Sequence, residues 1–158
     1  MSTLSPNPLA KHFRQPIIYL KLPSQGKWWL EGSVELPVTG ELPIYAMTAR
    51  DEITLKTPDA LLNGTSTVHV IESCCPAIKD AWKMPSVDVD VILLNIRIAS
   101  YGNSMDVDST CPHCQAVSRH TIDLNQVIER FRMPNYDQMI APQEGLFIKI
   151  KPQTYKDV

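Results

Sequence analysis

The residues best suited to chemistry in this sequence are Cys111-Pro112-His113-Cys114, in which two thiols are separated by two residues. Runs that alternate like strands precede and follow this turn, which predicts a β-hairpin over about residues 103–124. A Cys-x-x-Cys turn at the end of a hairpin resembles a zinc knuckle, because it holds two thiolates close enough to share one metal ion. The first cofactor that the sequence predicts is therefore zinc.

All the cysteines of the chain make one candidate set of metal ligands: Cys74, Cys75, Cys111 and Cys114. Structural zinc takes four such ligands in a tetrahedron. Adjacent cysteines bind one ion less often than spaced ones, so His113 or His120 can stand in for Cys75, which would then be a buried apolar residue. An iron–sulfur cluster, a disulfide across the turn, and a turn without metal are the open alternatives.

The surroundings of the turn do not resemble a catalytic centre. A catalytic zinc ion keeps an open position and needs a nearby acid or base, but the sequence has no His-Glu-x-x-His or His-x-Glu frame. A thioredoxin-like Cys-x-x-Cys would follow a strand and open a helix, whereas this one lies between two strand-like runs. Phosphate-binding loops and nucleophile elbows are absent from the sequence. We therefore predict a protein that is not an enzyme.

Length and charge narrow the class of protein further. With 158 residues, 44% of them hydrophobic, and a net charge of −2, the chain fits one folded domain. A nucleic-acid-binding zinc ribbon needs a basic surface, but the charges around the turn nearly cancel: Asp106, Asp108, Asp123, Arg119 and His120. No apolar run approaches the ~20 residues of a membrane span, and the first residues do not resemble a secretory signal. The sequence thus predicts neither nucleic-acid nor membrane partners.

The patterns along the chain predict a small α+β domain with several short helices and β-hairpins. Residues 33–47 alternate as a hairpin, and 145–151 as a strand. Helices are expected at the following places: from Thr48 with Asp51 as capping box, 58–62, 65–75, 86–101 and 123–132. The longest should begin with Ser86 as N-cap and end at Gly102. Its core-facing stripe should include the following residues: Val87, Val91, Leu94 and Ile98, widened by Ile92, Leu93 and Ile96.

The ends of the chain have a different composition. Residues 1–32 are rich in proline and predict an extended arm ahead of a body over 33–158, although 17–22 could form one short strand. Trp28 and Trp29 stand side by side in this arm, and two interpretations stay open. Either one ring packs on the domain while the other is partly exposed, or the arm docks onto a neighbouring subunit with tryptophan as a favoured interface anchor. At the other end, Thr154 begins a helical pattern that the chain does not complete. We therefore expect the natural protein to continue beyond residue 158.

From the middle of the chain onward, an ordered set of motifs is similar to a known family. The motifs are Glu72-Ser73-Cys74, the helix from Asp88-x-Asp90 to Gly102, the Cys111–Cys114 turn, and the stretch from Leu146 to Tyr155. Together they resemble the baseplate hub protein family of T-even-type contractile-tailed bacteriophages, over roughly residues 33–158. The resemblance implies that Cys74, Cys111 and Cys114 match cysteine positions of the family, whereas Cys75 is particular to this sequence.

The resemblance implies a structural protein of the virion tail baseplate, made in the host cytoplasm and placed at the central hub. Its expected partners are other baseplate and hub proteins, and further copies of the same chain. Two other functions stay open at this point. The first is a hub assembly factor that is absent from the mature virion, and the second is a zinc-ribbon module that binds nucleic acid.

Overall fold

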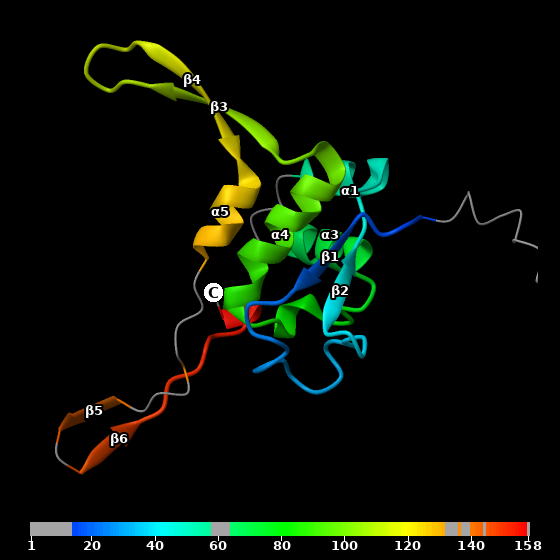
Figure 1. The fold of residues 1–158 in the computed structure, drawn as a ribbon, viewed down its shortest axis with the longest axis vertical. Helices are drawn as coiled ribbons and strands as arrows, with labels where there is room; N and C mark the ends of the chain where they lie inside the picture. The colour runs from blue at the N-terminus through cyan, green and yellow to red at the C-terminus, as the bar shows by residue number, and fades with distance from the viewer. Residues whose placement is uncertain (1–13, 58–63, 132–135, 137–139, 144, 158) are drawn as a thin grey trace, which may run out of the picture.

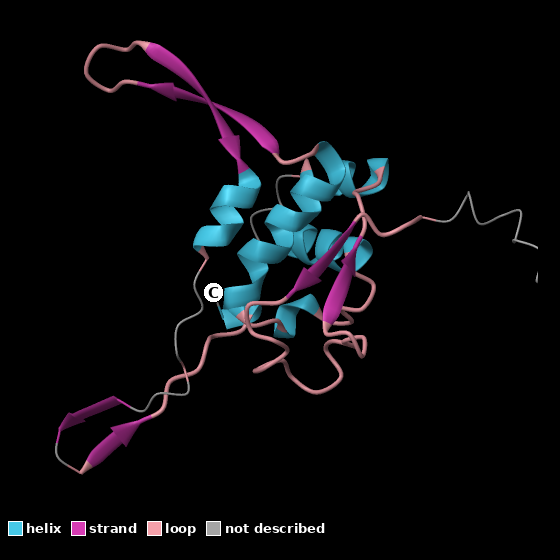
Figure 2. Cartoon of the chain, viewed as in Figure 1, coloured by secondary structure: helices cyan, strands magenta, loops and turns pink. Residues whose placement is uncertain are grey.

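The computed structural model of this chain describes residues 14–57, 64–131, 136, 140–143 and 145–157 (Figure 1). Helices gather in a body, and two β-hairpins extend from it at opposite ends (Figure 2). The prediction of a mixed helix-and-sheet domain is confirmed. In chain order the elements are β1 (Ile18–Lys21), β2 (Glu41–Ile44), α1 (Ala49–Leu55), α3 (Thr65–Cys74), η2 (Ala81–Lys83), α4 (Ser86–Tyr101), β3 (Ser104–Thr110), β4 (Val117–Asp123), α5 (Leu124–Arg130), β5 (Ile140–Gln143), β6 (Leu146–Ile148) and η3 (Tyr155–Asp157).

The core of the body lies where α3, α4 and the β1–β2 sheet meet. Ile71 of α3, Ile92 of α4 and Leu42 of β2 are fully buried there. Complete burial of such a side chain contributes roughly 1.5–3 kcal/mol relative to exposure. Because α4 contacts α3, α5, β1 and β2, it is the central helix of the body.

The β1–β2 sheet corrects two predictions about the first part of the chain. β2 pairs antiparallel with β1, with Leu20 opposite Leu42, rather than with residues 33–38 as the predicted hairpin requires. Residues 33–35 pair instead with residues 77–79, where the Glu35 N–H donates to the Ala77 carbonyl at 2.8 Å. Leu20 and Leu22 bring two apolar side chains into the core. Residues 14–32 are therefore part of the body and not an extended arm, and residues 1–13 lie outside the described part of the chain.

Several helices begin where the sequence predicts. Thr48 caps α1 by accepting from the backbone N–H of Asp51, whose carboxylate accepts in return from the Thr48 N–H at 2.7 Å. The predicted helices over 65–75 and 123–132 correspond to α3 and α5. The helix expected over 58–62 falls on residues that the structure does not describe.

The start of α4 differs from the prediction. Its N-cap is Pro85, so Ser86 is the first helical residue and provides no side-chain cap. The backbone before the helix is held by the C-terminal segment, because the Ser86 N–H donates to the Gln153 carbonyl at 2.9 Å. This pairing, formed with a segment more than sixty residues away, sets the helix start.

The buried face of α4 matches the predicted stripe in part. Of the predicted positions Val91, Ile92 and Ile96 are buried and the others are half-buried. The remaining members of the buried face are Asp88, Val89 and Asn95. Asn95 is accommodated because its amide donates to the Val91 carbonyl at 2.8 Å. Apolar periodicity alone does not predict the burial of polar side chains, because it contains no information on their hydrogen-bond partners in the core. Gly102 ends the helix as predicted, with a left-handed φ of +86°.

Candidate functional site

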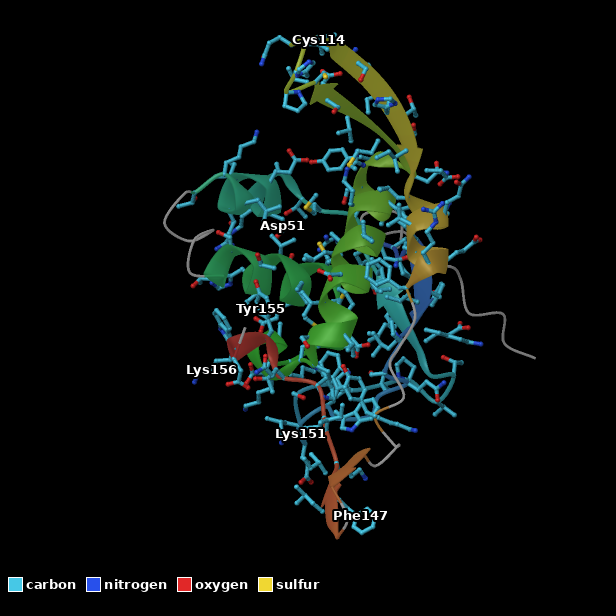
Figure 3. The ribbon with its side chains drawn as sticks, turned by 90° about the vertical axis from the view of Figure 1, so that its left-hand side faces the viewer. Asp51, Cys114, Phe147, Lys151, Tyr155 and Lys156 are labelled. Carbon is cyan, nitrogen blue, oxygen red and sulfur yellow. The ribbon has the colours of Figure 1, made fainter. Side chains whose placement is uncertain are left out.

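The β3–β4 hairpin carries the cysteine turn that the sequence singles out. Its two strands pair without interruption over seven residue pairs, and nearly all their side chains are exposed. Arg119 donates from Nε and Nη2 to the two carboxylate oxygens of Asp108 at 2.7 and 3.0 Å. The Thr121 hydroxyl donates to Asp106 at 2.7 Å. The backbone ladder thus forms a hairpin that extends far from the body, with polar pairs across its exposed surface (Figures 1 and 3).

The turn at the outer end of this hairpin is closed by backbone hydrogen bonds. The Cys111 N–H donates to the Ala116 carbonyl, and the Gln115 N–H donates to the Cys111 carbonyl, each at 2.9 Å. Three donors point toward Cys111 Sγ: the backbone N–H of Cys114, the backbone N–H of His113 and the Cys114 thiol. Their hydrogen bonds, largest effect first in that order, hold the pKa of the Cys111 thiol below its usual value. The turn therefore stabilises the thiolate form of Cys111, which is the form that binds metals, more than an ordinary exposed site does.

Cys74 and Cys75 lie in the opposite environment, at the end of α3. Both are fully buried in the core of the body. Burial raises the pKa of the Cys74 thiol and, more strongly, that of Cys75. Cys75 therefore behaves as a small hydrophobic side chain, whereas Cys74 Sγ also accepts from the Arg14 guanidinium at 3.4 Å.

The structure thus separates the four predicted ligands into two pairs. Cys111 and Cys114 share one turn, and Cys74 and Cys75 adjoin in the core, but the turn stands well away from α3 (Figures 1 and 3). Within the described ranges, no three side chains of His, Cys, Asp or Glu gather so as to hold a metal ion. The alternative ligands do not join the buried pair either, since His113 is in the turn and His120 is on β4. The four-cysteine set is therefore not assembled in the described chain.

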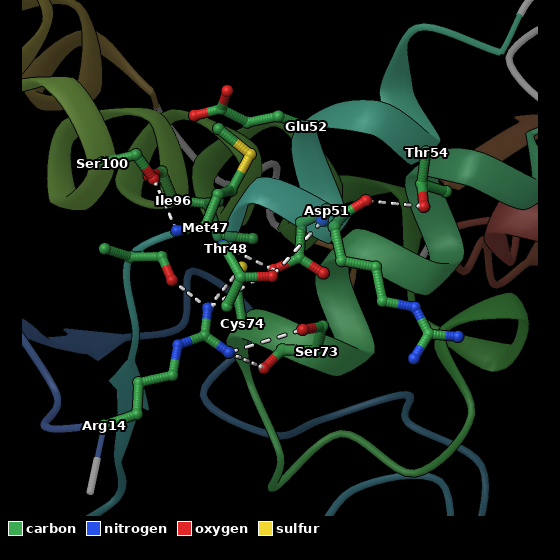
Figure 4. Close-up of polar contacts among 12 residues, drawn as sticks. Arg14, Met47, Thr48, Asp51, Glu52, Thr54, Ser73, Cys74, Ile96 and Ser100 are labelled. Carbon is green, nitrogen blue, oxygen red and sulfur yellow. Dashed lines mark hydrogen bonds and ion pairs between the residues drawn. The ribbon is translucent and has the colours of Figure 1, made fainter. Parts of the chain in front are cut away.

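A cluster of polar groups lies where α1 meets α3 and borders a cavity of about 400 Å³. Arg14 donates to the Ser73 carbonyl at 2.9 Å and to the Ala46 carbonyl, and its guanidinium lies 3.6 Å from the Asp51 carboxylate (Figure 4). Burial raises the pKa of Asp51, but hydrogen bonds from Thr48 and the charge of Arg14 outweigh this effect, so the pKa lies below its usual value. These groups fasten the segment before β1 to both helices.

The two tryptophans of the predicted arm are half-buried on the body. Trp29 packs against the core, and its indole N–H donates to Asp88 Oδ2 at 2.8 Å. The Asp88 carboxylate, which is fully buried, also accepts from the backbone N–H of Ser24 at 2.9 Å. The Trp28 ring contacts Tyr136 edge-on, with 5.3 Å between the ring centroids. Trp29 therefore anchors its own loop to the body, as the first of the two interpretations expects.

The β5–β6 hairpin presents an apolar surface on the segment that the sequence predicts as a strand over 145–151, and for which it predicts no contact role. Leu146, Phe147 and Ile148 of β6 are all exposed, Phe147 to 69%, and Ile150 follows them. Their adjacency in the sequence could have predicted this exposure. Three consecutive apolar residues in a strand point to both of its faces, so the body on one side cannot cover them all. Figure 3 places Phe147 at the end of the molecule opposite Cys114.

Comparison with known proteins identifies the family of this chain. The family described as T4 bacteriophage base plate protein matches residues 17–158, whereas no curated protein and no solved structure matches. In the described residues, none of the helices has the length and apolar character needed to span a bilayer. A protein of this family is a structural part of the virion tail and contacts other baseplate proteins. Because the match covers nearly the whole sequence, this chain belongs to the T4 bacteriophage base plate protein family.

Proposed function

We propose that this protein is a non-enzymatic component of the central hub region of a contractile-tail baseplate and acts through contacts made by its β5–β6 hairpin. The observation that carries the proposal is the run of exposed apolar side chains on β6: Leu146, Phe147 and Ile148. A contiguous exposed apolar surface of this kind marks a contact with another protein. Membership in the baseplate family makes another baseplate subunit the natural partner.

The architecture of this hairpin supports the same conclusion. Its strands have only four and three residues and pack chiefly against each other. An isolated two-stranded hairpin is at best marginally stable in water, so it gains stability when a partner covers its apolar side chains. Lys149 and Lys151 follow β6 and are exposed. We therefore expect the partner to offer an apolar groove with acidic groups at its rim.

The proposal is tested with Phe147→Ser, supplied in trans to a phage that lacks its own functional copy. Loss of one buried phenylalanine contact should reduce the amount of this protein in purified tails by about tenfold or more. The matched control is Val38→Ser, which changes a fully exposed apolar residue on a loop of the body. Circular dichroism of both variants checks that the body is folded. Normal incorporation of the Phe147 variant would contradict the proposal.

Placement at the hub is tested by cross-linking from Lys149 and Lys151 in assembled tails, followed by mass spectrometry. Links to subunits of the tail axis would support the hub, and links confined to peripheral subunits would contradict it. The same spectra address the alternative of an assembly factor. In that case the protein would be found in assembly intermediates and be missing from finished virions.

A further inference from the structure

We propose that two copies of this chain join end to end through their hairpin turns, with Cys111 and Cys114 of each copy binding one shared zinc ion. The inference concerns β3–β4 alone and does not depend on the hub placement or on the apolar β5–β6 hairpin. It assigns the turn a metal ion, for which the described part of a single chain supplies only two of the four ligands. The partner is a second copy of the same chain.

The geometry of the turn provides half of a tetrahedral site. Both sulfurs belong to one tight turn, which is closed by two backbone hydrogen bonds of 2.9 Å. The N–H groups of His113 and Cys114 point toward Cys111 Sγ. Such donors orient a ligating sulfur and stabilise the charge it carries when it binds a metal. Four thiolates around one ion form a closed structural zinc site.

The position of the turn makes a second copy able to reach it. Cys114 is exposed, and the turn lies at the outer end of a hairpin that stands clear of the body (Figures 1 and 3). Two hairpins can therefore meet at their ends without contact between the two bodies. A two-fold contact places the same residues of both chains at the axis, so two thiols from each copy make four.

The charges near the turn permit this contact. Asp108 and Arg119, three and five positions from the nearer cysteine, neutralise each other through their paired hydrogen bonds. Two identical ends therefore approach without strong repulsion between like charges. Cys74 and Cys75 cannot take the place of the second copy, because both are enclosed in the core.

The test uses the whole chain, reduced and freed of metal, and Co²⁺ as a spectroscopic probe of the zinc site. We expect thiolate-to-cobalt charge-transfer bands and tetrahedral d–d bands that saturate at one ion per two chains. Light scattering in the same titration should show the mass doubling, and Zn²⁺ should displace the cobalt signal. Cys111→Ser and Cys114→Ser should each abolish both the bands and the doubling. Cys75→Ala, the matched control, should retain both.

Three results would overturn the inference. Saturation at one ion per chain with unchanged mass would mean that the site is completed within a single chain. Absence of the charge-transfer bands in the reduced protein would mean that the turn does not bind a soft metal. Bands that persist in the Cys111 variant would place the metal elsewhere. In each case Phe147→Ser can still reduce tail incorporation, so the two proposals fail independently.

Discussion

The two cysteine pairs of this protein lie in regions of opposite physical character. Cys74 and Cys75 are enclosed in the core of the body, where burial raises the pKa of both thiols. Cys111 and Cys114 are at the end of a projecting hairpin, where backbone N–H groups lower the pKa of the Cys111 thiol. One residue type is thus an inert core side chain in one region and a potential ligand in the other. The environment, and not the number of cysteines, decides which pair can do chemistry.

The same contrast applies to what holds each region together. The body depends on apolar burial, with Ile71, Ile92 and Leu42 at its centre. The β3–β4 hairpin depends on its backbone ladder and on exposed polar pairs such as Asp108 with Arg119. Exposed pairs contribute little to stability. The body therefore has a buried apolar core to stabilise it, which the β3–β4 hairpin lacks over its described residues.

The largest expected effect is on thiol reactivity. Cys111 and Cys114 should react with iodoacetamide on the order of 1,000-fold faster than Cys74 and Cys75, because the buried pair is reached only when the body opens at a cost of ~5 kcal/mol. Intact-mass spectrometry should show two rapid additions in the native protein and four in denaturant. If iodoacetamide rapidly modified all four thiols of the native protein, the predicted difference in reactivity between the two cysteine pairs would be wrong.

The next effect is on stability, and it compares one side chain in each region. Ile92→Ala should lower the free energy of unfolding by about 2–5 kcal/mol, because it leaves a cavity in the core. Val117→Ala on β4, whose side chain is 68% exposed, should change it by less than about 0.5 kcal/mol. Urea unfolding followed by circular dichroism measures both. Similar losses in the two variants would mean that the hairpin has a core of its own.

A smaller, pH-dependent effect distinguishes two carboxylates within the body. The pKa of Asp51 is lowered, so its contribution to stability is present above pH 3.8 and is lost as the pH falls through the lower folded-state value. Burial raises the pKa of Asp88, and this outweighs the hydrogen bonds from Ser24 and Trp29. The folded protein therefore binds that proton more tightly than the unfolded chain, and the contribution of Asp88 decreases as the pH rises above 3.8.

Unfolding experiments on Asp51→Asn and Asp88→Asn between about pH 3 and pH 7 test these signs. The cost of Asp51→Asn should be about 1 kcal/mol near neutrality and shrink toward acid, because the substitution removes the charged partner of the helix cap. The stability of the wild type relative to Asp88→Asn should instead increase toward acid. Parallel pH profiles for the two variants would contradict the assignment of opposite shifts.

The smallest expected effect compares two arginines that both pair with an aspartate. Arg14→Gln should destabilise the body by about 1 kcal/mol, since Arg14 donates to carbonyl groups of two separate segments as well as pairing with Asp51. Arg119→Gln on the exposed hairpin should leave the urea midpoint unchanged within error. A clear loss in the Arg119 variant would show that the hairpin contributes to the stability of the body.

Local patterns were sufficient for much of the fold. The capping box of Thr48 with Asp51, the helix over 65–75, and the hairpin that carries the cysteine turn all occur where they are predicted. Each of these features is specified by residues within a few positions of one another. The turn itself is also local, so its two thiols are correctly placed together.

The wrong predictions all involve partners that are distant in the sequence. β2 pairs with β1 rather than with residues 33–38, because Leu20 of β1 is buried opposite Leu42 and residues 33–35 pair with residues 77–79. Asp88 belongs to the buried face of α4, because Ser24 and the Trp29 indole, about sixty residues earlier, satisfy its carboxylate. Neither contact has a signature in the local pattern of apolar and polar residues.

The sequence by itself therefore determined the mixed helix-and-sheet class, most helix positions, and the turn that holds Cys111 and Cys114. Only the tertiary structure decided that Cys74 and Cys75 are buried apart from that turn, and that β6 leaves its apolar side chains uncovered. The physical reason is the range of the interactions. Caps and turns depend on neighbouring residues, whereas burial depends on which distant segments meet, and a local pattern does not encode those meetings.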